Sequence, residues 1–141
     1  MADINAGRLK HLEMLQAVIT RMANNSFLVK GWSITLFSAI LVFAAKEARI
    51  RLTWIALVPI VFFWILDAYF LRQERLFRKL YEVYAAQSQT DPTDFGMKTT
   101  VVNDKVDSQF TVMVSSTLLL FHGGLLVTLV LVWWLTSCGC Y

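Results

Sequence analysis

Residues 52–84 constrain the fold most strongly, because an apolar run there passes directly into a charged segment. Residues 52–71 contain one charged side chain, Asp67, and about twenty residues are what an α-helix needs to cross a bilayer. No Gly or Pro occurs in residues 62–88, so the sequence gives no signal for the helix to end at the membrane surface. We therefore predict one rod that combines a membrane span with a cytoplasmic stalk.

Two further apolar runs predict an all-α membrane protein with three transmembrane helices. With 57% hydrophobic and 16% charged residues, the chain is too apolar for a soluble domain of 141 residues. The predicted parts are an amphipathic N-terminal helix (1–25), a transmembrane hairpin (26–71, with spans 26–45 and 52–71), a cytoplasmic stalk and loop (72–111), a third transmembrane helix (112–135) and a short tail (136–141).

Local signals refine this outline. The apolar stripe of residues 1–25 is typical of an amphipathic helix. We favour a helix that lies on the membrane surface or packs on the stalk; the alternative is a contact between subunits of an oligomer. Residues 24–26 (Asn-Asn-Ser) predict a helix break or start, and Pro59 predicts a kink inside the second span. The β-branched residues within 98–102 predict one short strand in the loop.

The distribution of basic residues predicts the topology. With the N-terminus in the cytoplasm, every Lys and Arg except Lys46, Arg49 and Arg51 lies in or beside the cytoplasm, as the positive-inside rule requires. We expect a bacterial inner-membrane protein whose C-terminus is periplasmic. Cys138 and Cys140 then face an oxidising compartment. They could form an intermolecular disulfide, form a strained disulfide with each other, or remain free thiols, and we favour thiols without a functional role.

Lys30 and Asp67 lie about one turn inside the membrane at the same end of antiparallel spans. A charge in hydrocarbon costs at least roughly 2.5–3.5 kcal/mol, less near the interface, so pairing would relieve both groups. One hypothesis is an interhelical salt bridge that fixes the register of the hairpin. The equally weighted alternative is that each side chain extends separately toward the headgroups.

His122 falls near the middle of the predicted third span, where a polar group needs a partner. Helical spacing places Thr111, Ser115 and His122 on one face, which would line a pore or gate in an oligomer. Small residues nearby, Gly123, Gly124 and Thr128, would let helices pack closely. We favour a packing role for His122 over a pore.

The stalk carries four basic residues that would contact an anionic ligand or lipid, although topology alone also explains them: Arg72, Arg75, Arg78 and Lys79. Its opposite side is apolar and has to be covered by the N-terminal helix or by another subunit, which is the best argument in the sequence for a homo-oligomer. No catalytic constellation, metal-ligand spacing or cofactor motif is recognisable, and nucleic-acid binding is not expected.

Two segments carry a resemblance, HLEMLQAVITRMANNSFLVKGW (residues 11–32) and LDAYFLRQERLFRKLYE (residues 66–82). They resemble a family of small bacterial multi-span membrane proteins, which are in turn similar to membrane effectors of anti-phage defence systems. The resemblance implies an effector that damages the inner membrane when a companion enzyme makes a nucleotide messenger. It assigns no binding residue.

Two functions therefore remain as hypotheses. The first is an oligomeric inner-membrane effector or channel that perturbs the membrane when triggered from the cytoplasm. The alternative is a non-conducting membrane anchor or accessory subunit that binds a soluble partner protein. An intramembrane enzyme is not expected, because Ser115 and His122 would stand about 10.5 Å apart along a helix.

Overall fold

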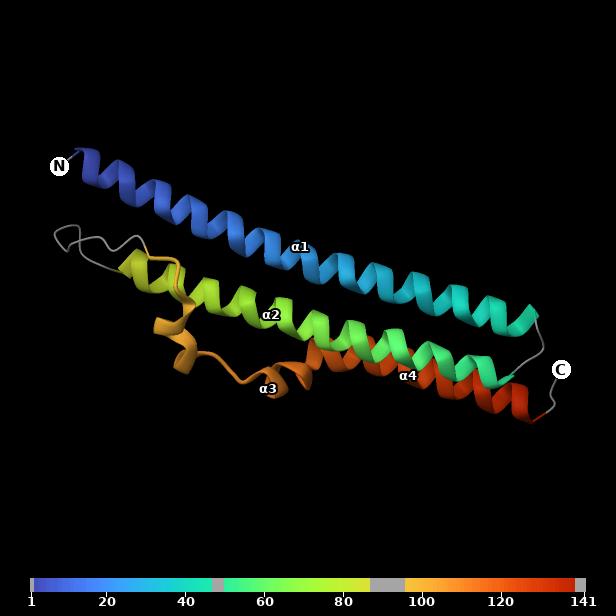
Figure 1. Ribbon diagram of the computed structural model, residues 1–141. Helices are drawn as coiled ribbons and strands as arrows, with labels where there is room; N and C mark the ends of the chain where they lie inside the picture. Colours follow the sequence, from blue (N-terminus) through green and yellow to red (C-terminus); the bar gives the residue numbers. More distant parts are fainter. Residues whose placement is uncertain (1, 47–49, 87–95, 139–141) are drawn as a thin grey trace.

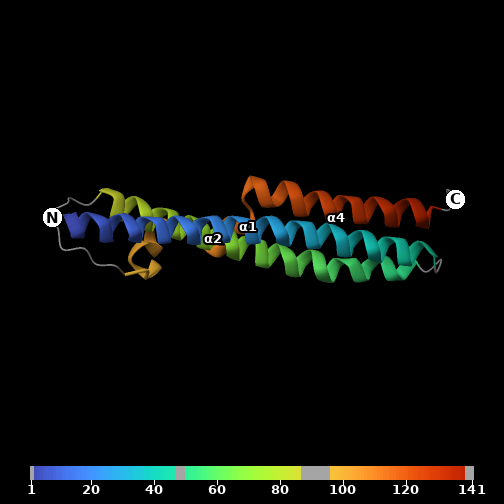
Figure 2. The same cartoon turned by 90° about the horizontal axis from the view of Figure 1, so that it is seen from above.

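The computed structural model describes residues 2–46, 50–86 and 96–138, and every regular element among them is helical. Helix α1 (Ala2–Lys46) runs antiparallel to η1 (Ile50–Ala56) and α2 (Leu57–Ala86), and the chain returns through η2 (Thr99–Lys105), α3 (Gln109–Met113) and α4 (Ser116–Ser137). Figures 1 and 2 show a long, narrow bundle with the N-terminus at one end and α4 finishing at the other. The all-α prediction is confirmed.

Three helices are long and apolar enough to cross a membrane: Ala6–Lys46, Thr53–Ala86 and Ser116–Ser137. Their outer faces carry exposed large apolar side chains, such as Phe43, Phe62 and Leu120, which suits contact with lipid. Trp54 and Trp133 lie together at the far end, with ring centroids 5.7 Å apart, where tryptophan is common at a bilayer interface. The chain is a membrane protein with three candidate transmembrane helices.

Helix α1 is continuous through residues 24–26, so the predicted break there is wrong. The physical reason lies in Ser26. Its hydroxyl donates a hydrogen bond to Asp67 on α2 and therefore does not act as a cap that would start a new helix. The N-terminal segment and the first span are consequently one helix of 45 residues.

Pro59 lies in the first turn of α2, directly after the 3₁₀ segment η1. The first amides of an α-helix have no partner within the helix, so proline is tolerated there. Pro59 therefore interrupts no continuous α-helix, and the winding changes from 3₁₀ to α just before it. Beyond Pro59, α2 continues without interruption from the apolar run into the charged stalk, as predicted.

The N-terminal half of α1 covers the apolar side of the stalk. Leu15 of α1 packs with Leu76, Leu80 and Tyr84 of α2 and with Val102 of η2 in one buried cluster. The N-terminal part of α1 therefore packs on the stalk, which is one of the arrangements expected from its apolar stripe. Because α1 of the same chain supplies the cover, the apolar stalk no longer requires a second subunit.

The end of α2 is held by Arg8. Its guanidinium donates to the carbonyl oxygens of Tyr84 (3.0 Å) and Ala85 (3.2 Å), which lie in the last turn, where a helix has unpaired carbonyls and a partial negative charge. The Tyr84 hydroxyl donates to the Gly96 carbonyl oxygen at 2.9 Å. These bonds fix the end of the bundle where α1 begins and α2 ends.

The segment predicted as a strand at residues 98–102 forms the start of η2, so the strand prediction is wrong. The described residues offer no strand for it to pair with, and a 3₁₀ turn buries Val102 completely against α2. The predicted loop also covers residues 87–95, which lie outside the described residues.

The third span begins later than predicted, at Ser116 instead of 112. Val112 belongs to the short helix α3, which is capped by Ser108 through a bond from the Thr111 amide to the Ser108 hydroxyl. The chain turns at Val114 and Ser115 before α4 starts. Serine at both starts is the signal that could have indicated two helices.

Candidate functional site

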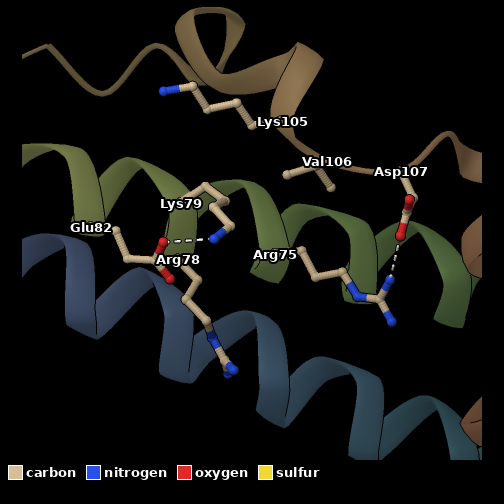
Figure 3. A pocket seen from close by; sticks show the side chains of 7 residues that line it. All are labelled: Arg75, Arg78, Lys79, Glu82, Lys105, Val106 and Asp107. Carbon is tan, nitrogen blue, oxygen red and sulfur yellow. Dashed lines mark hydrogen bonds and ion pairs between the residues drawn. The ribbon is translucent and has the colours of Figure 1, made fainter.

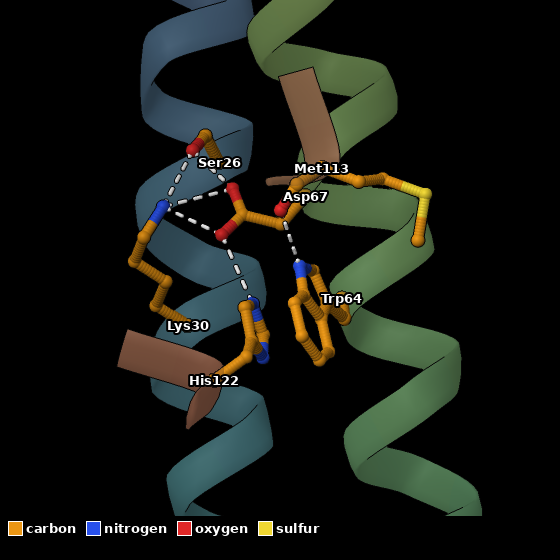
Figure 4. Close-up of polar contacts among 6 residues, drawn as sticks. All are labelled: Ser26, Lys30, Trp64, Asp67, Met113 and His122. Atoms are coloured by element: carbon orange, nitrogen blue, oxygen red, sulfur yellow. Dashed lines mark hydrogen bonds and ion pairs between the residues drawn. The ribbon is translucent and has the colours of Figure 1, made fainter. Parts of the chain in front are cut away.

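Asp67 lies where α1, α2 and α4 meet (Figure 4), and none of its surface is exposed. Its carboxylate accepts hydrogen bonds from Ser26 and Lys30 of α1 and contacts His122 of α4. We call Ser26, Lys30, Asp67 and His122 the Asp67 cluster. It is the point at which polar groups from all three candidate transmembrane helices converge.

Lys30 and Asp67 form the interhelical pair that the sequence suggested. The Lys30 ammonium lies 2.8 Å from Oδ1 and 2.7 Å from Oδ2 of Asp67, and it also donates to the Ser26 hydroxyl at 2.9 Å. The Lys30 side chain keeps 22% of its surface exposed, so its stem lies against the apolar helices while the charge stays at their polar junction.

Ser26 bridges the two ions. It donates its proton to Asp67 and accepts one from Lys30, which uses both hydrogen-bonding functions of a hydroxyl. Its position one turn before Lys30 on α1 places both side chains on the face toward α2. Sequence reasoning missed Ser26 as a partner, although the four-residue spacing to Lys30 was the available signal.

His122 contacts the second carboxylate oxygen of Asp67. Its Nε2 lies 3.2 Å from Asp67 Oδ2, and because an ionised carboxylate can only accept, Nε2 carries the proton. The Nδ1 atom is buried and has no hydrogen-bond partner among the described residues.

Trp64 fixes the orientation of the imidazole. Its ring stacks on His122 with centroids 5.6 Å apart and an interplanar angle of 8°, and its Nε1 donates to the Met113 carbonyl oxygen at 2.9 Å. Trp64 thereby links α2 both to His122 and to the end of α3. Sequence reasoning did not select this residue.

The predicted pore-lining face is not formed. Thr111 is exposed on α3, Ser115 lies in the turn before α4, and His122 points from the second turn of α4 to Asp67. They belong to different elements, so α-helical spacing does not align them. His122 is also not at mid-span: it lies near the start of α4, at the level of Lys30 and Asp67.

The small residues predicted to pack helices face outward. A Cβ atom on Gly123 or Gly124 would meet no atom within 4 Å among the described residues. Thr128 is exposed, and its hydroxyl donates to the Gly124 carbonyl oxygen of its own helix. Within one chain these residues therefore do not bring two helices together.

The basic residues of the stalk are held by partners in the same chain. Arg72 donates to the Asn103 side chain (2.7 Å) and the Asp107 carbonyl oxygen (3.1 Å), and Arg75 pairs with the Asp107 carboxylate at 3.3 Å. Two pairs lie within α2, Arg78 with Glu74 and Lys79 with Glu82. No anion is needed to keep these four side chains in place.

Cys138 is an exposed free thiol, whereas Cys140 lies outside the described residues. Among the described residues there is no group of His, Cys, Asp and Glu side chains arranged to hold a metal ion. The chain matches no known protein-family model, no curated protein and no solved structure.

Proposed function

We propose that the protein is a bacterial inner-membrane effector that acts as a homo-oligomer and perturbs the membrane when it is triggered from the cytoplasm. The observation that supports this function best is the Asp67 cluster. Apolar side chains could hold three helices together without charges, so a buried ionic junction suits an arrangement that can be exchanged for another. The resemblance of residues 11–32 and 66–82 supports a role in anti-phage defence.

In this proposal α2 couples the cytoplasm to the bilayer. The same helix carries the buried stalk residues Leu76 and Leu80 and, about two and a half turns before Leu76, Asp67. A companion protein or nucleotide messenger that displaced the stalk would move Asp67 relative to Lys30 and His122. The separated polar groups would be costly in lipid, so they would favour contact with another copy of the chain.

A non-conducting membrane anchor is the second candidate, and a specific observation favours it. In a single copy, Ser26, Lys30 and the Nε2 atom of His122 all contact Asp67, while Thr111 lies apart on α3. One chain therefore offers no aligned polar path through its apolar helices. An anchor would instead present the stalk and η2 to a soluble partner protein.

Variants of the cluster distinguish these functions without knowledge of the trigger. Asp67→Asn and His122→Phe are expressed in bacterial cells, and uptake of a membrane-impermeant dye is compared with that of the unaltered protein at equal membrane content. An effector held at rest by the cluster predicts dye uptake without a trigger, stronger for Asp67→Asn. If neither variant admits dye, although both reach the membrane and keep their helical circular dichroism, the effector is rejected in favour of the anchor.

Oligomerisation is tested separately. Native mass spectrometry of the protein released from nanodiscs is expected to show more than one copy per particle, and a greater share of oligomers for Asp67→Asn. A strictly monomeric particle for both proteins would contradict the homo-oligomer.

A further inference from the structure

A cleft of about 250 Å³ lies between the stalk of α2 and the segment that ends η2. Figure 3 shows its side chains, with Lys105 coming from η2 and the other cations from α2. Four cationic residues line it, Arg75, Arg78, Lys79 and Lys105, against two acidic residues, Glu82 and Asp107. The cleft thus has an excess of two positive charges.

The cationic side chains of the cleft differ in the contacts that they already make. Arg75 is engaged with Asp107, and its neighbour Arg72 holds Asn103 and the Asp107 backbone, so both fasten the loop to the stalk. Lys105 is exposed and makes no hydrogen bond or ion pair with the described residues. Arg78 is bound to Glu74 through one terminal nitrogen, NH2, and retains further donors.

We propose that this cleft binds a phosphate group, with Arg78, Lys79 and Lys105 as its contacts. Glu74, which lies outside the cleft, pairs with Arg78 and lowers the excess to one, which leaves Lys105 as the cation without an acidic partner among the described residues. A guanidinium beside ammonium groups is a recurrent phosphate-binding combination. The volume accommodates a phosphate with part of the molecule that carries it. This inference does not depend on the proposed function, since a membrane anchor could bind phosphate equally well.

The position of the cleft allows two sources of that phosphate. Lys79 follows Asp67 by twelve residues, which places it about 18 Å farther along α2. If Asp67 lies just inside the hydrocarbon, the cleft lies at the cytoplasmic edge of the headgroup layer. An anionic lipid headgroup and a soluble phosphate compound can both reach this level.

The test uses the whole chain in nanodiscs of phosphatidylcholine. Pyrophosphate is titrated calorimetrically into the unaltered protein, into the variant Arg78→Ala/Lys105→Ala, and into Lys10→Ala/Arg21→Ala. The last variant is the matched control, because it removes two exposed cations from the cytoplasmic part of α1. In a second arm, phosphatidic acid is added to the nanodiscs, and the lipid retained by the protein is counted by native mass spectrometry.

Saturable binding of pyrophosphate that weakens about tenfold or more in the cleft variant, but not in the control, supports a soluble phosphate ligand, because each lost charge-assisted contact is a strong one. If the cleft variant retains less phosphatidic acid than the control while pyrophosphate binding does not differ, the result supports a lipid headgroup as the ligand. The variant Arg78→Lys/Lys105→Arg, which keeps both charges, retains most of the binding. The proposal is overturned if neither ligand distinguishes the cleft variant from the control while circular dichroism shows both folded.

Discussion

Asp67 shows how one residue organises the membrane part of the chain. A carboxylate with no exposed surface has lost its hydration, and this loss is tolerable only when hydrogen bonds and an opposite charge replace the water. Ser26, Lys30 and His122 supply these replacements. Removing one ion should therefore harm the protein more than removing both.

We predict that Asp67→Asn destabilises the fold by about 3 kcal/mol, at the lower end of the range for a broken buried pair because Lys30 retains some exposure. Lys30→Met combined with Asp67→Asn should recover part of this loss, since no ion is then left without its partner. Thermal unfolding in detergent, followed by circular dichroism, measures both. A double variant as unstable as the sum of the single changes would show that the two ions do not interact.

The Lys30–Asp67 contact could be predicted because both residues occupy the same depth in neighbouring antiparallel spans. The contact between His122 and Asp67 could not be predicted. It depends on where α4 begins and on how that helix is rotated, and the apolar sequence around His122 is nearly uniform on all sides of the helix. Ser26 was misjudged for a different reason: serine both starts helices and bonds across them, and only packing decides which.

At the scale of the elements, α1 and α2 are each part of two environments. The N-terminal half of α1 and the C-terminal half of α2 enclose a core of Leu15, Leu76 and Leu80 with Val102, and their other halves present apolar side chains outward. This stalk core resembles that of a soluble protein. Its stability should therefore respond to cavities while the membrane part stays folded.

Leu15→Ala, at a site with no exposed surface, is expected to destabilise the stalk half of the bundle by about 2–5 kcal/mol. Hydrogen exchange followed by mass spectrometry should then show faster exchange in residues 8–20 and 76–86, with the amides near Asp67 unchanged. Leu9→Ala is the control, because Leu9 is 61% exposed and its truncation opens no cavity. Equal effects of the two substitutions would contradict the stalk core.

The α2 rod was predictable because no helix-breaking residue interrupts it. Helix ends that depend on tertiary contacts were not. Val102 adopts a 3₁₀ turn because burial against α2 outweighs its β-propensity. The turn before α4 follows Met113, whose carbonyl oxygen accepts a hydrogen bond from Trp64 of α2. In both places the local sequence allows two structures, and a partner far along the chain selects one.

For the whole molecule, the start of α1 and the end of α4 lie at opposite ends of the bundle (Figure 1), and Cys138 directly follows α4. With the orientation proposed from the basic residues, Cys138 lies in the periplasm. We predict that a membrane-impermeant maleimide labels Cys138 in cells with a permeable outer membrane, in a Cys140→Ser background. A cysteine in place of Lys10, with Cys138 also replaced by Ser, should be labelled only after lysis. The reverse pattern would invert the topology.

The junction at Asp67 also has a consequence for the order in which the protein is built. His122 is 55 residues later in the chain than Asp67, so ribosomes complete Ser26, Lys30 and Asp67 well before they reach α4. The first two spans can enter the membrane as a hairpin whose ions already neutralise each other. The third span is synthesised last. Its place beside the hairpin is then set by the contact between His122 and the Asp67 carboxylate.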